Sequence, residues 1–115
     1  KADAVSQSEL YRQSFAISVC LSEDVKSPTI IGAQAANELL NIKGVKASFV
    51  LTDYQGKIYV SARSIDEVNV QIIMERMGGG GHMSIAATQL EGISMAEAIG
   101  SLKSTIDTMI EEGAI

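Results

Sequence analysis

The hydrophobic pattern of the chain begins with residues 15–21 (FAISVCL), which are almost wholly apolar. A run of this kind is typical of a β-strand that is covered on both faces. Successive side chains of a strand point to opposite faces, so the larger residues share one face. The other face carries only Ala16, Ser18 and Cys20. We therefore expect a helix to pack closely against it.

A helix is predicted after this strand. Ser27 is a good capping residue, and Pro28 suits the first helical turn. Apolar residues then recur at helical spacing at Ile31, Ala35, Leu39 and Ile42. Gly44 is expected to end the helix.

Two alternating segments follow, around the sequence Asp53–Tyr54–Gln55–Gly56, and this pattern predicts a β-hairpin. In its second strand, one face carries Ile58, Val60 and Ala62. The opposite face carries Tyr59, Ser61 and Arg63.

The rest of the chain predicts helix, loop, strand and helix. Asp66 can cap a helix that ends in the glycine tetrad 78–81, and a short strand follows over residues 84–90. Ser94 and Glu97 form a capping box for the last helix. Its apolar stripe consists of Met95, Ile99, Leu102, Ile106 and Met109. The order β-α-β-β-α-β-α predicts a single α/β (α+β) domain with a mixed β-sheet flanked by helices.

The composition limits the class of protein. A chain of 115 residues with 46% apolar content suits one ordered domain. Its net charge of −5 disfavours long nucleic acids, whose binding relies on clustered Lys and Arg, so a small phosphorylated ligand is easier to accept. No signal peptide or membrane helix is predicted. The single cysteine, Cys20, fits a reducing cytoplasm, and a start at Lys1 without methionine suggests a piece of a longer protein.

The segment Gly78–Gly79–Gly80–Gly81–His82 carries the strongest functional signal. One glycine is enough to end a helix, and each further glycine costs about 0.5–1 kcal/mol relative to alanine. Surplus glycines are therefore expected where the backbone must approach something closely. Consecutive backbone N–H groups can form a concave phosphate site, and His82 could donate a hydrogen bond or a positive charge to it. A helix stop with a flexible tether and a packed His82 is an equally good explanation of the residues alone.

Arg63 is the second candidate, within residues 61–64 (SARS) at the end of the hairpin. A guanidinium group suits phosphate or a nucleobase edge because its donors form a fixed fork. An ordinary solvated charge at a strand end is the alternative, and it is the favoured one for a single sequence. Tyr59 on the same face could stack on a base or be an ordinary half-buried tyrosine. One His and one Cys cannot make a zinc site, and no acidic ligand motif is present, so no metal or catalytic residue is predicted.

With these motifs together, residues 15–113 resemble the DHH-associated domain, the second lobe of the DHH phosphoesterase superfamily. The resemblance rests on Gly78–His82 followed by Ala86–Ala87. With residues 61–64 (SARS), 69–71 (NVQ) and 86–90 (AATQL), the chain is particularly similar to the membrane-anchored cyclic di-AMP phosphodiesterases of Gram-positive bacteria (GdpP type). We therefore expect residues 1–13 to be a residual linker or connecting segment, and residues 14–115 to be the DHH-associated substrate-binding domain.

The resemblance implies a division of labour between two lobes. A DHH lobe of the same parent is expected to hold a Mn²⁺ pair that activates water for attack on phosphorus, and no cofactor is expected in this chain. The expected substrate is cyclic di-AMP or a short adenine nucleotide, with pApA as the product. Carried over to this chain, the substrate-binding residues are Ser61, Arg63, Ser64, Gly78, Gly79, Gly80, Gly81 and His82. The resemblance also implies a cytoplasmic domain whose parent is anchored in the bacterial cell membrane.

Two other functions stay open at this point. The lobe could belong to an oligonucleotide exonuclease of the RecJ or nanoRNase type, which uses the same loop, although the acidic balance and the surroundings of Arg63 disfavour this. It could instead be an assembly module, with Met95 and Met109 in the seam of a homodimer. Burial of these methionines against the sheet is the favoured explanation.

Overall fold

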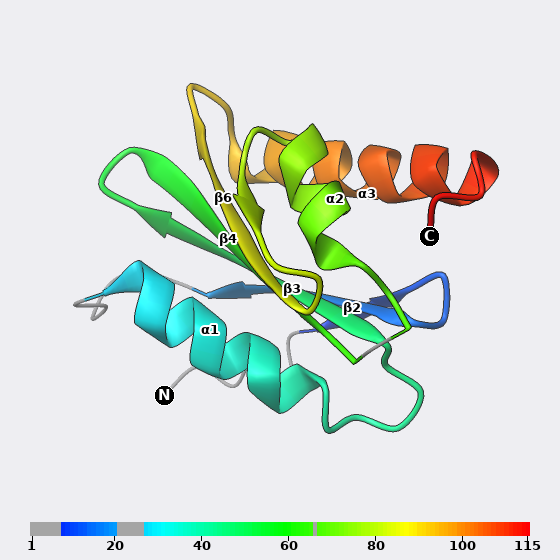
Figure 1. Ribbon diagram of the computed structural model, residues 1–115. Coiled ribbons are helices and arrows are strands. Elements are labelled where there is room, and N and C mark those ends of the chain that lie inside the picture. The colour runs from blue at the N-terminus through cyan, green and yellow to red at the C-terminus, as the bar shows by residue number, and fades with distance from the viewer. Residues whose placement is uncertain (1–7, 21–26, 66) are drawn as a thin grey trace.

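The structure, a computed structural model, describes residues 8–20, 27–65 and 67–115. Its elements are β1 (Glu9–Tyr11), β2 (Phe15–Cys20), α1 (Pro28–Leu39), β3 (Ala47–Tyr54), β4 (Lys57–Ser64), α2 (Val70–Arg76), β5 (Gly80–Gly81), β6 (Ile85–Glu91) and α3 (Met95–Glu111). They build a six-stranded sheet in the order β1-β2-β3-β4-β6-β5, with α1 on one face and α2 and α3 on the other (Figure 1). Strands β2 and β3 run parallel and the other neighbouring strands antiparallel, so the sheet is mixed. The predicted α+β domain and element order are confirmed, and the structure adds the short strands β1 and β5.

Strand β2 is covered on both faces, as its apolar run predicted. Phe15 and Ile17 lie in the core that α2 and α3 cover, whereas Ala16 packs with α1 on the other face. The small side chains on that face let the helix come close. Leu21, the last residue of the predicted run, lies outside the described residues.

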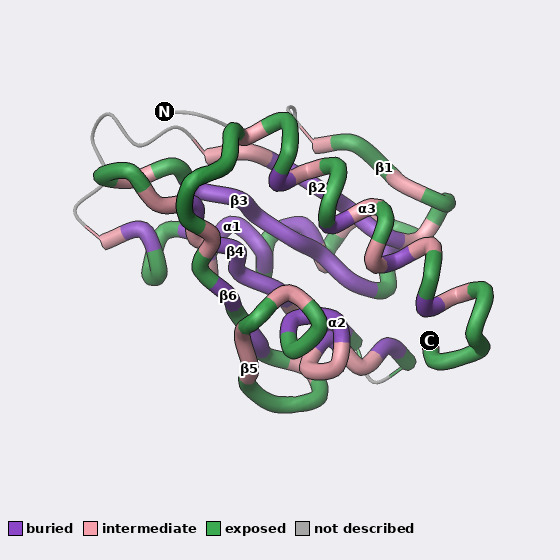
Figure 2. Tube along the Cα trace, turned by 90° about the horizontal axis from the view of Figure 1, so that it is seen from above, coloured by how far each residue is buried: buried purple, intermediate pink, exposed green. Residues whose placement is uncertain are grey.

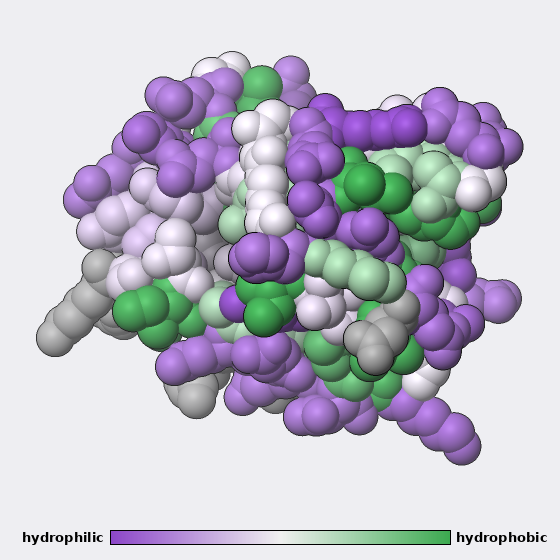
Figure 3. All heavy atoms as spheres, in the orientation of Figure 1, coloured by the Kyte–Doolittle hydropathy of each residue, from purple (hydrophilic) through white to green (hydrophobic). Residues whose placement is uncertain are grey.

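The predicted apolar face of helix α1 is confirmed at Ala35 and Leu39 and is wrong at Ile31. It begins as expected, with the Ser27 side chain accepting from the Ile30 amide, but it ends at Leu39, before Ile42. Its buried residues are Pro28, Gly32, Ala35, Ala36 and Leu39. Ile30 and Ile31 are 58% and 36% exposed. Figure 3 shows hydrophobic side chains on the surface near the start of α1. Close approach to the sheet decided the orientation of the helix, because its smallest side chains face inward.

The larger core lies between the sheet and helices α2 and α3. Strands β3 and β4 run buried through the centre of the molecule in Figure 2. On β4, Ile58, Val60 and Ala62 face this core, as the alternation of the hairpin predicted. The hairpin turn places Gln55 and Gly56 at φ of 51° and 83°. Two consecutive residues with positive φ are typical of the tight turns that join antiparallel strands.

Helices α2 and α3 both begin at a side-chain cap. The Asn69 side chain accepts from two backbone N–H groups in the first turn of α2. Asp66, the predicted cap, lies outside the described residues. Ser94 and Glu97 form the predicted capping box of α3. Among the described helices, none has the length and apolar character that a membrane span requires.

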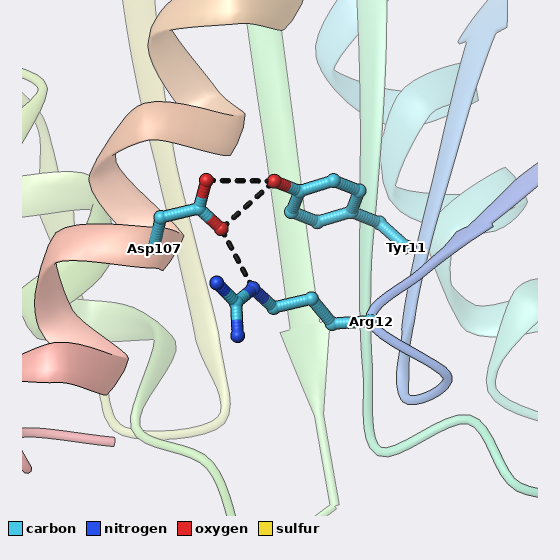
Figure 4. A network of polar contacts seen from close by, with 3 residues as sticks. All are labelled: Tyr11, Arg12 and Asp107. Atoms are coloured by element: carbon cyan, nitrogen blue, oxygen red, sulfur yellow. Dashed lines mark hydrogen bonds and ion pairs between the residues drawn. The ribbon is translucent and has the colours of Figure 1, made fainter.

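Strand β1 is tied to α3 by a polar network (Figure 4). The Tyr11 hydroxyl donates to both carboxylate oxygens of Asp107 at 2.8 Å, and the Arg12 Nε donates to the same group at 2.7 Å. Lys103 forms a further ion pair with Glu9 at 2.8 Å. Residues 9–11 belong to the segment predicted as a residual linker or connecting segment, and in the structure they form the edge strand β1. The domain boundary at residue 14 stays a prediction.

Replacing Asp107 by Asn should make this network visible as a pH-dependent loss of stability. The Tyr11 hydroxyl, and then Arg12, hold the pKa of Asp107 below its ordinary value of 3.8. A lowered pKa stabilises the folded state at pH values above the ordinary pKa, and the contribution is lost as the pH falls through the folded pKa. Urea unfolding should therefore show Asp107→Asn to be less stable than the wild type at pH 7, with a smaller deficit at pH 3.

The exposed Glu111→Gln substitution on the same helix is the matched control, and it should produce no such difference between the two pH values. An equal deficit of Asp107→Asn at both pH values would show that the carboxylate charge is not what holds β1.

Candidate functional site

A cleft of about 610 Å³ lies on the α1 side of the sheet. Its wall includes Thr29 and Ala33 from α1, Tyr59, Ser61 and Arg63 from β4, Ile85, Ala87 and Gln89 from β6, and the whole segment Gly78–His82. All predicted binding residues except Ser64 thus line one cavity. Its volume falls within the range of about 300–1,000 Å³ that is usual for small-molecule sites.

Ser64 lies outside the cleft and has an internal contact. Its side chain is buried, and its hydroxyl donates to the Val68 carbonyl at 2.6 Å. This bond holds the chain between β4 and α2. Ser64 therefore contributes to the fold, and it is not part of the cleft wall.

Gly78 ends helix α2. It has a φ of 91°, which glycine adopts without steric cost. Its N–H donates to the Glu75 carbonyl at 3.1 Å, and that of Gly79 donates to Met74 at 2.8 Å. These two bonds form the Schellman arrangement at a helix C-terminus.

Gly79 and Gly81 allow β5 to lie tightly against β6. A Cβ atom on Gly79 would collide with the carbonyl oxygen of Ala87 and with Thr88. A Cβ atom on Gly81 would lie 2.5 Å from the Cα of Ala86, and Gly81 also has a φ of 143°. The fold itself therefore requires glycine at these two positions.

Neither a positive φ nor a steric contact requires glycine at position 80. Its φ is outside the left-handed region, and a Cβ atom there would meet nothing within 4 Å. Its backbone nevertheless lines the cleft. Of the four glycines, Gly80 is the position at which the fold leaves room for a side chain.

Most of the backbone N–H groups of this segment are used within the fold. Those of Met77, Gly78, Gly79 and His82 all donate to carbonyl groups of the chain. The His82 N–H donates to Ile85 at 2.7 Å, so the alternation of an antiparallel ladder makes Gly80 and Ala87 the next bonded pair. These bonds hold the shape of the segment, which presents a backbone surface without side chains next to His82.

Arg63 is the charged group of the cleft wall. Its side chain is partly buried, and its Nη1 donates to the Ala62 carbonyl at 2.9 Å. Arg12 and Arg76 pair with carboxylates, whereas Arg63 forms no ion pair with any described residue. Burial lowers the pKa of Arg63. A partly buried cation without a carboxylate partner among the described residues is compatible with an anionic occupant of the cleft.

The described residues do not provide a metal site. No three or more of their His, Cys, Asp and Glu side chains gather in a group that could hold an ion. The donor set of a Mn²⁺ pair is therefore not found in the part of the chain that the structure describes.

Sequence reasoning missed Gln89 as a residue of the cleft. It lies on β6, directly opposite Tyr59 of β4, and its side chain is exposed. Residues 85, 87 and 89 share the α1 side of β6 because side chains alternate along a strand. The same alternation could have placed Gln89 beside Tyr59 had the pairing of β4 with β6 been known.

Comparison with known proteins decides the family. The sequence pattern of the DHHA1 domain matches residues 13–112. The chain belongs to the DHHA1 domain family. This membership confirms the family expected from the residues 61–64, 69–71 and 78–90.

Relatives of this DHHA1 domain include two named phosphodiesterases. It is 48% identical over 104 residues to the cyclic-di-AMP phosphodiesterase PdeA of Listeria monocytogenes serotype 1/2a (strain 10403S). The aligned region covers 90% of this chain and 16% of PdeA. It is 44% identical over 115 residues to the cyclic-di-AMP phosphodiesterase GdpP of Bacillus subtilis (strain 168), covering 98% of this chain and 18% of GdpP. The chain thus spans roughly one sixth of the length of either relative.

The fold is also similar to a solved structure, an exopolyphosphatase-related protein from Bacteroides fragilis. The TM-score is 0.80 at 21% identity, over 92% of this chain and 32% of that one. At this identity the likeness establishes the fold of the DHHA1 domain.

Alanine substitutions at two neighbouring glycines should separate the fold from the cleft. Gly79→Ala forces a Cβ atom against the β6 backbone, so its free energy of unfolding should fall by about 1–3 kcal/mol. Gly80→Ala places the same atom in open space and reduces the freedom of the unfolded chain, so its stability should be unchanged or rise by up to about 1 kcal/mol. Chemical denaturation of both variants measures this difference. Equal losses of stability in the two variants would contradict the conclusion that the fold leaves room for a side chain at Gly80.

Proposed function

We propose that this chain is the substrate-binding lobe of a cyclic di-AMP phosphodiesterase. The nucleotide phosphate lies in the cleft beside Arg63, His82 and Gly80. The observation that carries the proposal is the partly buried Arg63, which lacks a carboxylate among the described residues and lines the same cavity as the glycine segment. The relatives PdeA and GdpP, which bear the name of this activity, support the choice of substrate.

Each binding residue has a different role in this proposal. The guanidinium fork of Arg63 binds phosphate oxygens with charge-assisted hydrogen bonds. His82, exposed at the end of β5, donates from its imidazole ring at the rim. Gly80 lets the phosphate or sugar approach the backbone because no side chain stands in the way. Ser61 contributes to the floor of the cleft between Arg63 and Tyr59.

The hydrolytic step belongs to another part of the parent protein in this proposal. A DHH lobe supplies a Mn²⁺ pair, which activates water for attack on phosphorus. This lobe holds the cyclic dinucleotide for that attack, and the parent is anchored in the bacterial cell membrane. The small share of PdeA and GdpP that the chain covers leaves ample sequence for such parts in proteins of this kind.

Substituting Arg63 by Ala should weaken the binding of cyclic di-AMP to the 115-residue chain about tenfold or more. Hydrogen bonds to charged groups contribute about 1.5–3 kcal/mol, and about 1.4 kcal/mol corresponds to a factor of ten. Isothermal titration calorimetry at low ionic strength measures the affinity. Thermal unfolding of the variant checks that it folds.

Arg76→Ala is the matched control, since Arg76 pairs with Glu112 on the opposite side of the sheet and should leave binding unchanged. The same preparation with Mn²⁺ should leave cyclic di-AMP intact. Unchanged affinity in Arg63→Ala, tighter binding of short RNA than of cyclic di-AMP, or turnover by the chain alone would each contradict the proposal.

A further inference from the structure

The cleft has two chemically different ends. Tyr59 and Arg63 lie on the same face of β4, four residues apart, which corresponds to about 13 Å along a strand. Arg63 stands opposite Ile85, close to His82, and forms the cationic end. Tyr59 stands opposite Gln89 and forms an uncharged end with an aromatic ring and a carboxamide.

The Tyr59 ring is held in place from one side. It makes an edge-on contact with Tyr54, with ring centroids 6.4 Å apart and an angle of 61° between the planes. Tyr59 is only partly buried and lines the cleft. An oriented ring at the wall of a cavity offers a surface on which a flat heterocycle can stack.

Gln89 brings hydrogen-bonding groups next to this ring. Directly opposite residues of an antiparallel pair have Cβ atoms about 4.5–5.5 Å apart, so the two side chains share one position in the cleft. Within the part of the chain that the structure describes, the Gln89 carboxamide has no hydrogen-bond partner, whereas Gln71 on α2 donates to Glu75 at 3.2 Å. Gln89 is therefore available to a ligand.

Between the two ends, the floor is made of small side chains. Ser61 lies between Tyr59 and Arg63 on β4, and Ala87 stands opposite it on β6. These small side chains leave space for a sugar between a bound phosphate and a bound ring.

We propose that Tyr59 and Gln89 form a subsite that recognises an adenine base. The inference rests on the proposed function, which places the phosphate at Arg63. A carboxamide presents one donor and one acceptor side by side, and adenine offers the complementary acceptor N7 and donor N6 on one edge. Guanine offers two acceptors, N7 and O6, at the same place, and these suit arginine or lysine instead. Gln89 thus selects adenine, and Tyr59 stacks on either purine.

The test compares three probes on the 115-residue chain, namely AMP, GMP and ribose 5-phosphate, with affinities from NMR titrations at millimolar ligand. The wild type should prefer AMP over GMP about fivefold, the low end of the discrimination from one bidentate contact. Gln89→Leu should abolish that preference and leave the affinity for ribose 5-phosphate unchanged. Gln71→Leu on α2 is the matched control and should retain the preference.

Further variants separate recognition from folding. Tyr59→Leu should weaken AMP and GMP alike, about fivefold or more, without affecting ribose 5-phosphate, whereas Tyr59→Phe should bind both as the wild type does. Gln89→Glu keeps the shape of the side chain but has no N–H for N7, so it should also lose the preference. It replaces Gln89→Leu as the test if the latter does not fold.

The results distinguish this inference from the proposed function. Equal or tighter binding of GMP by the wild type, or an unchanged AMP preference in both Gln89 variants, would overturn the adenine subsite even if Arg63→Ala abolishes phosphate binding. Affinities for AMP and ribose 5-phosphate that are unchanged in Arg63→Ala, together with an AMP preference that depends on Gln89, would keep the subsite and refute the phosphate site. Absence of binding by all three probes would overturn both.

Discussion

The close contact of β5 with β6 is the constraint on which the candidate site depends. A side chain at Gly79 or Gly81 would collide with the backbone of β6, so only glycine allows the two strands to pair at this edge of the sheet. The pairing places the segment 78–82 along one wall of the cleft. On the same face, Gly32 lets α1 approach the sheet, since a Cβ atom there would lie 2.6 Å from the Ser61 Oγ. Glycine thus permits two close contacts next to the cleft.

The pairing of β5 with β6 gives the glycine tetrad a role in the fold. Its N–H groups are largely used to end α2 and to pair with β6, so they contribute shape more than hydrogen bonds to a ligand. Charge in the cleft comes from Arg63, which is partly buried and has no carboxylate partner among the described residues. In the proposed function, one guanidinium group, one imidazole ring and a stretch of bare backbone hold the phosphate. Gly80 is the glycine whose identity the fold does not explain.

Local patterns allowed much of this fold to be predicted from the sequence. The hairpin around Gln55–Gly56 and the capping box of Ser94 and Glu97 depend on neighbouring residues, and both are present. The buried face of α1 was predicted wrongly at Ile31, because close helix packing is a tertiary requirement that apolar spacing does not report. The separate roles of the four glycines and the position of Gln89 depend on the pairing of β6 with β4 and β5, which no local pattern reveals.

The most direct test of the account is a map of where cyclic di-AMP contacts the 115-residue chain. Amide shifts in ¹H–¹⁵N NMR spectra, recorded as the dinucleotide is added, provide that map. The account predicts that the largest shifts fall on Gly80, Gly81 and His82 and on the neighbouring β4 strand around Arg63, with little change on α2 and α3. Shifts concentrated on the helices of the opposite face, or on β1, would contradict it.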